Sequence, residues 1–184
     1  MMQTAASLAN LAALVYDKVL ALPAAVGDPG FARAKTFLAR ARDQNVEEAK
    51  TFNDAAVHLG GKAQNKPDPV LQTATLRSLD YATDLAGALG VAASMETASA
   101  ASCTTFIGTL ADTNALRAAA TIAPVQASRT AVLDVLRQLR PDITIANGQR
   151  PDLIQIPGAV AVQASPVPFL RTTAKRSEME GQIT

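Results

Sequence analysis

Hydrophobic residues in the first 140 positions recur at the spacing of helices rather than of strands. Leu8, Leu11 and Val15 lie three or four residues apart, which places them on one face of a helix predicted over residues 4–22. A second apolar stripe with the same period predicts a longer helix over residues 31–59. The pattern therefore indicates an all-α chain.

Glycine and proline residues mark the end of the second helix and the connection that follows. Gly60 and Gly61 form a natural stop, because glycine accepts the left-handed geometry just past a helix end. The NKPDP stretch at residues 65–69 then prevents helix formation until about residue 70. Residues 70–78 are expected to form a short helix or a crossover into the third long helix.

Two more long helices are predicted over residues 80–110 and 114–139. The first of them is rich in small residues, which allows a neighbouring helix to approach closely. Asp112 or Thr113 is expected to cap the second one. Pro124 lies inside that helix and should kink it.

The helical pattern ends at about residue 140, where five prolines punctuate a segment of 45 residues. We therefore divide the chain into a four-helix bundle over residues 1–140 and an extended Pro-rich C-terminal tail over residues 141–184. The tail is expected to pack on the bundle or on a partner. The long connection between the second and third long helices suits a bundle with one crossover.

Composition and charge exclude several classes of function. The 17 basic and 16 acidic residues give a net charge of +1, so no electrostatic footprint for nucleic acid is visible. The chain has one cysteine, Cys103, and one histidine, His58, which excludes an internal disulfide, a Cys-based metal site and any multi-histidine site.

No apolar stretch is long enough for a membrane span, so none is expected. The first residues, MMQTAASLANLAALVY, lack the basic region of a signal peptide. The sequence alone leaves the compartment open.

Two side-chain pairs stand where helices of a metal-binding bundle would carry ligands. Asn45 precedes Glu48 by three residues, and Gln126 precedes Arg129 by three residues. This spacing puts both members of a pair on one helical face. It is the geometry of the Glu-x-x-His pairs that hold metal in di-iron carboxylate bundles, but neither pair is intact here.

Several segments resemble the ferritin-like domain proteins of actinobacteria, a family usually made with an export leader. The resemblance covers nearly the whole chain and is carried by AASLANLAALVYDKVLALP, by KTFLARARDQNVEEAKTFNDAAVHLGGKAQNKPDPVL, by ATIAPVQASRTAVL and by the tail IPGAVAV…FLRTTAKRSEMEGQI. It implies a ferritin-like four-helix bundle and an exported or cell-envelope location. It also implies six positions that correspond to the family's metal ligands: Ala9, Asn45, Glu48, Glu96, Gln126 and Arg129.

Most of these positions lack a metal-binding side chain. Ala9 has no donor, whereas the family normally has glutamate there; Asn45 and Gln126 are neutral amides; and only two of the six are carboxylates. Iron or manganese needs several anionic or imidazole donors, so no metal and no other cofactor is expected. Arg129 is expected to act as the cation in place of the metal and to contact Glu96. The two amides are candidates to hydrogen-bond each other across the core.

Three functions follow from this interpretation, in decreasing order of preference. The first is a catalytically silent, non-enzymatic homologue with a structural or assembly role, whose partner is a second copy or a ferritin-like paralogue. The second is a residual iron- or manganese-binding oxidoreductase or iron-handling protein that uses Glu48 and Glu96, with Glu47 and Asn45 as further donors. The third is a carrier of a small ligand in the vacated core.

For other residues of chemical interest, a structural role is expected. Glu47 and Glu48 beside Lys50 suggest a solvated face, and for Glu48 this interpretation and the inward position implied by the resemblance are equally supported. His58 near a helix end suits the helix dipole. Cys103 is expected to be a small core residue, and Tyr16 and Tyr81 are expected at the edge of the core.

Overall fold

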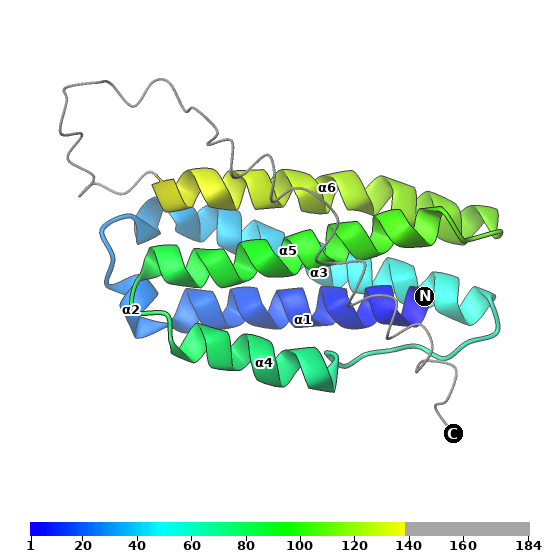
Figure 1. Ribbon diagram of the computed structural model, residues 1–184, viewed down its shortest axis with the longest axis horizontal. Coiled ribbons are helices and arrows are strands. Elements are labelled where there is room, and N and C mark those ends of the chain that lie inside the picture. The colour runs from blue at the N-terminus through cyan, green and yellow to red at the C-terminus, as the bar shows by residue number, and fades with distance from the viewer. Residues whose placement is uncertain (139–184) are drawn as a thin grey trace.

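The computed structural model of the protein describes residues 1–138, and every regular element in that range is a helix (Figure 1). Four long helices lie side by side: α1 (Met2–Ala21), α3 (Phe31–His58), α5 (Leu85–Ile107) and α6 (Thr113–Gln138). Two shorter helices accompany them: α2 (Pro23–Val26), at one end, and α4 (Pro69–Asp80), along the side of α1. The all-α prediction is confirmed for these residues. The expectations for the tail, residues 141–184, lie outside the described residues.

The third long helix begins later than predicted. We expected it over residues 80–110, but α4 continues to Asp80 and α5 begins only at Leu85. Asp84 causes this break, because its extended backbone starts a new helix and its carboxylate accepts a hydrogen bond from the Gly87 amide at 2.8 Å.

Aspartate residues also cap the N-termini of α4 and α6. Asp68 accepts hydrogen bonds from the amides of Val70 and Leu71, each at 2.9 Å. Asp112 accepts one from the Ala115 amide at 2.8 Å, so the prediction of a cap at this position is confirmed for Asp112. Helix α6 runs through Pro124 without ending there. These caps satisfy amides that the first turn of a helix leaves unpaired.

The buried apolar residues form two clusters that share the four long helices. The first, around Leu11, Leu38, Leu89 and Leu133, fills the end of the core nearest α2. The second, around Ala9, Phe52, Cys103 and Ala119, is dominated by alanine and fills the other end. Along α3, α5 and α6, buried polar residues occupy the positions between the two clusters. The core is therefore layered, with polar side chains in the middle.

Among the described residues, no helix combines the length and the apolar content needed to cross a bilayer. This agrees with the absence of a predicted span.

Candidate functional site

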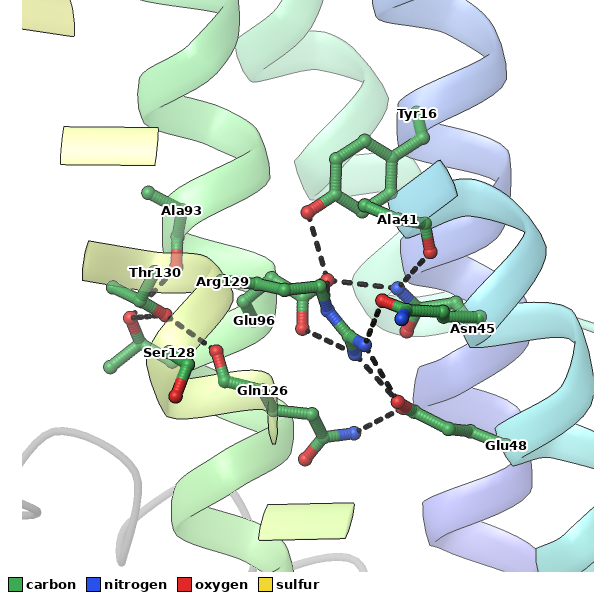
Figure 2. A network of polar contacts seen from close by, with 12 residues as sticks. Tyr16, Ala41, Asn45, Glu48, Ala93, Glu96, Gln126, Ser128, Arg129 and Thr130 are labelled. Carbon is green, nitrogen blue, oxygen red and sulfur yellow. Dashed lines mark hydrogen bonds and ion pairs between the residues drawn. The ribbon is translucent and has the colours of Figure 1, made fainter. Parts of the chain in front are cut away.

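The polar layer brings together five of the six residues that the resemblance singled out. Helix α3 supplies Asn45 and Glu48, α5 supplies Glu96, and α6 supplies Gln126 and Arg129 (Figure 2). All five side chains are buried, and Glu96 is completely inaccessible to solvent. Both members of each pair lie on one helical face, as the spacing of three predicted, and that face points inward, as the resemblance implied.

Arg129 lies between the two carboxylates and binds both of them. Its Nε donates to Glu96 Oε1 at 2.8 Å, and its Nη2 donates to Glu96 Oε2 at 3.0 Å. Towards α3, Nη1 donates to Glu48 Oε1 at 2.7 Å and Nη2 donates to Glu48 Oε2 at 3.0 Å. The predicted contact between Arg129 and Glu96 is confirmed. All four carboxylate oxygens accept a hydrogen bond from one guanidinium group.

Neutral donors complete the shell around the carboxylates. Tyr16 Oη donates to Glu96 Oε1 at 2.9 Å, and Asn45 Nδ2 donates to the same oxygen at 2.8 Å. Gln126 Nε2 donates to Glu48 Oε2 at 2.9 Å. The two amides do not hydrogen-bond each other, so that expectation was wrong. Each NH₂ group donates to a carboxylate instead, because a carboxylate accepts a stronger hydrogen bond than an amide oxygen does.

Two residues of this network were not singled out as site residues. Tyr16, expected only at the edge of the core, is fully buried at its centre. It follows Ala9 by seven residues, two helical turns on the same face, and this spacing could have identified it. Gln44 accepts a hydrogen bond from Arg129 Nη1 at 3.2 Å, although it is an exposed neighbour of Asn45.

The network contains two carboxylates and one guanidinium, which leaves an excess of negative charge. Burial raises the pKa of Glu96 above its ordinary value, and the charge and hydrogen bonds of Arg129 only partly oppose this. Burial alone would lower the pKa of Arg129, but hydrogen bonds and charge from Glu48 and Glu96 outweigh it and raise that pKa. The guanidinium therefore stays positive at any physiological pH.

The donor set does not fit a pair of metal ions. Arg129 occupies every oxygen of Glu48 and Glu96, and its fixed charge repels a second cation at the same place. Ala9, where the resemblance places a family ligand, is buried within the alanine-rich cluster and offers no donor. No group of three or more His, Cys, Asp or Glu side chains suited to a metal lies in residues 1–138.

Four further residues of chemical interest lie outside the polar layer. Glu47 is exposed and pairs with Lys50 at 2.6 Å, so its assignment to a solvated face is confirmed. Cys103 is a buried core residue, and burial raises the pKa of its thiol to about 12, with a further contribution from the charge of Glu48. Tyr81 is not at the edge of the core but is 71% exposed, because it lies in the turn between α4 and α5. His58 is the last residue of α3, and its Nε2 lies 3.8 Å from Oδ2 of Asp112.

A groove of about 830 Å³ runs along the seam between α3 and α6. Glu48 and Gln44 form part of its wall, so the groove reaches the edge of the polar layer where Arg129 Nη1 binds both residues. No pattern in the sequence indicated this groove, because a groove depends on how far apart two helices lie.

Comparison of the chain with known protein families, with curated proteins and with solved structures finds no match in any of the three.

Proposed function

We propose that this protein is a ferritin-like four-helix bundle whose metal site has been replaced by a buried Glu–Arg–Glu core. We further propose that it has a structural or assembly role and is not an enzyme. One observation carries the proposal: a single guanidinium group accounts for all four oxygens of the two carboxylates at the centre of the helices.

The chemistry of the centre supports a structural role over catalysis. A metal ion could use Glu48 and Glu96 only if Arg129 withdrew, which would leave the guanidinium buried without its partners. The network also ties α3, α5 and α6 together and reaches α1 through Tyr16, so each long helix contributes to it. A buried network that joins all four long helices favours one arrangement of them, although the amide oxygens of Asn45 and Gln126 have no hydrogen-bond partner in it.

The assembly role and the exported location rest on the resemblance. A second copy of the chain or a ferritin-like paralogue is the proposed partner. The mass of the purified chain in solution, measured across a range of concentrations, tests self-association. Co-purification with the paralogue tests the other partner.

The proposal that the centre holds no metal is tested by titrating Fe²⁺ and Mn²⁺ into the chain and by elemental analysis of the purified protein. We expect no stoichiometric binding by the wild type and no change on replacing Glu96 with Gln. Stoichiometric metal that is lost in Glu96→Gln would contradict the proposal. It would favour the alternative, a residual iron- or manganese-binding oxidoreductase that uses Glu48 and Glu96.

Arg129→Ala provides the matched variant for this titration, because it removes the cation and leaves both carboxylates in place. If Arg129 stands in for a metal ion, this variant should bind Mn²⁺ more tightly than the wild type does. Far-ultraviolet circular dichroism with and without metal shows whether the variant is folded when it is tested.

A further inference from the structure

The groove between α3 and α6 has the composition of a docking surface. Its apolar part comes from α6, where Ala118, Ile122 and Val125 line it. Val125 is 39% exposed, although it lies on a concave surface. The other nine of its twelve lining residues are polar or charged, and the charged ones come from both helices: Arg40, Asp43, Glu47, Glu48 and Arg117. Surfaces that bind a polypeptide segment typically combine apolar side chains with polar ones in this way.

The groove also brings solvent close to the polar layer. Glu48 and Gln44 contact Arg129 from the groove side, so water that enters the groove reaches the edge of the Glu48–Arg129 ion pair. A segment that covers the groove would exclude this water and strengthen the ion pair by lowering the local dielectric constant.

The sequence beyond α6 contains a segment of matching chemistry. Residues 153–170, LIQIPGAVAVQASPVPFL, form an uncharged run of 18 residues with several Val, Ile and Leu side chains. The apolar side chains of this run gain free energy by leaving water. It contains three prolines, which lack the amide hydrogen that a helix interior or a central strand would use.

The connecting residues are long enough to bring this run to the groove. Val125 lies 13 residues before Gln138, which corresponds to about 20 Å along α6 at the helical rise of about 1.5 Å per residue. The 14 residues 139–152 can span more than twice that distance when extended at about 3.3 Å per residue. A segment joined by so short a linker has an effective concentration in the millimolar range at its own groove.

We propose that the groove between α3 and α6 binds part of the uncharged run 153–170 of the same chain. The groove is about 16 Å long, judged from the rise of α3 between Arg40 and Thr51, which accommodates about five extended residues. This inference stands on the groove and the run. It does not depend on the metal-free centre, so either proposal can fail without the other.

Photo-crosslinking from within the groove tests the occupant. A photoreactive phenylalanine analogue is placed at position 125 of the full-length chain, and in a control at position 132. Val132 lies two turns further along α6, outside the groove lining, and is 40% exposed. We expect position 125 to crosslink to residues 153–170 at monomer mass and position 132 not to do so.

Limited proteolysis with elastase, which cleaves after small aliphatic residues such as those at 159–162, gives a second measurement. We expect Val125→Asp to increase the cleavage rate of this run by about tenfold or more, and Val132→Asp to leave it unchanged. Circular dichroism verifies that both variants keep their helices.

Three outcomes would overturn the proposal. They are equal cleavage rates in the wild type and Val125→Asp, crosslinks from position 125 to a second copy of the chain, and crosslinks confined to residues 1–138. The second outcome would identify the groove as an interface between copies.

Discussion

The polar layer around Arg129 and the alanine-rich cluster around Ala9 adjoin each other in one core but are stabilised in different ways. The cluster consists of small apolar side chains such as Ala6 and Ala9 packed around Phe52. Its stability comes from many weak contacts, none of which needs a particular partner. In the polar layer, each carboxylate oxygen has named donors, and removing one donor leaves a buried charge under-paired. We therefore expect conservative substitutions to cost little stability in the alanine-rich cluster and much more in the polar layer.

The largest expected effect comes from removing the central cation. Arg129→Met keeps much of the side-chain volume but leaves Glu48 and Glu96 buried without their cation. We expect the free energy of unfolding, measured by urea denaturation, to fall by about 3–5 kcal/mol.

The matched control lies in the alanine-rich cluster. Ile122→Val removes one methylene group there and should lower the free energy of unfolding by only about 0.5–1.5 kcal/mol. If Arg129→Met lowers the free energy of unfolding by less than Ile122→Val does, the polar layer is not more sensitive to substitution than the alanine-rich cluster.

A smaller effect is expected from removing one neutral donor. Tyr16→Phe deletes the hydroxyl that donates to Glu96 Oε1 and preserves the ring. Because the acceptor is a buried carboxylate, the free energy of unfolding should fall by about 1.5–3 kcal/mol. Tyr81→Phe, on the exposed turn, should change it by less than about 0.5 kcal/mol. Equal effects of the two substitutions would argue against the Tyr16 hydrogen bond.

The polar layer should also make the protein sensitive to alkaline pH. Burial, together with the negative charge of Glu96, raises the pKa of Tyr16 above its ordinary value of 10.0. The neutral phenol is therefore preferred in the folded state. Its contribution to stability is complete below about pH 10 and is lost as the pH rises through the folded-state pKa.

This is measured best in Tyr81→Phe, because Tyr16 and Tyr81 are the two tyrosines of the chain. In this variant the ultraviolet absorbance of phenolate should appear together with the loss of helical circular dichroism. Phenolate that forms while the helices remain intact would contradict the buried, hydrogen-bonded position of Tyr16.

The smallest effect is expected one residue away from the network. Glu47→Ala removes an exposed ion pair with Lys50 and should change the free energy of unfolding by about 0.5 kcal/mol or less. Glu48→Ala should cost several kcal/mol, because it leaves Arg129 with one carboxylate in place of two. Comparable losses for these two neighbours would mean that burial does not set the difference between them.

Much of the helical pattern and part of the network could be predicted from the sequence. The apolar period located three of the long helices to within about two residues, because it reflects local geometry. The break at Asp84 was missed, since an aspartate that caps a helix and one on its surface look alike without the backbone. Arg129 and Glu96 could be paired because the resemblance placed both at ligand positions facing the core, where a charge requires a partner of opposite sign.

The sequence by itself determined where most helices of residues 1–138 lie, and that Asn45 shares a helical face with Glu48 and Gln126 with Arg129. The meeting of Glu48, Glu96 and Arg129 among the helices was implied by the resemblance. Only the tertiary structure decided which donors meet which acceptors: that Tyr16 joins Glu96, and that Asn45 and Gln126 turn to separate carboxylates. It also decided that α3 and α6 leave a groove beside Glu48. The physical reason is range: periodicity and spacing act within one helix, whereas hydrogen-bond partners and grooves depend on the distance and rotation between helices.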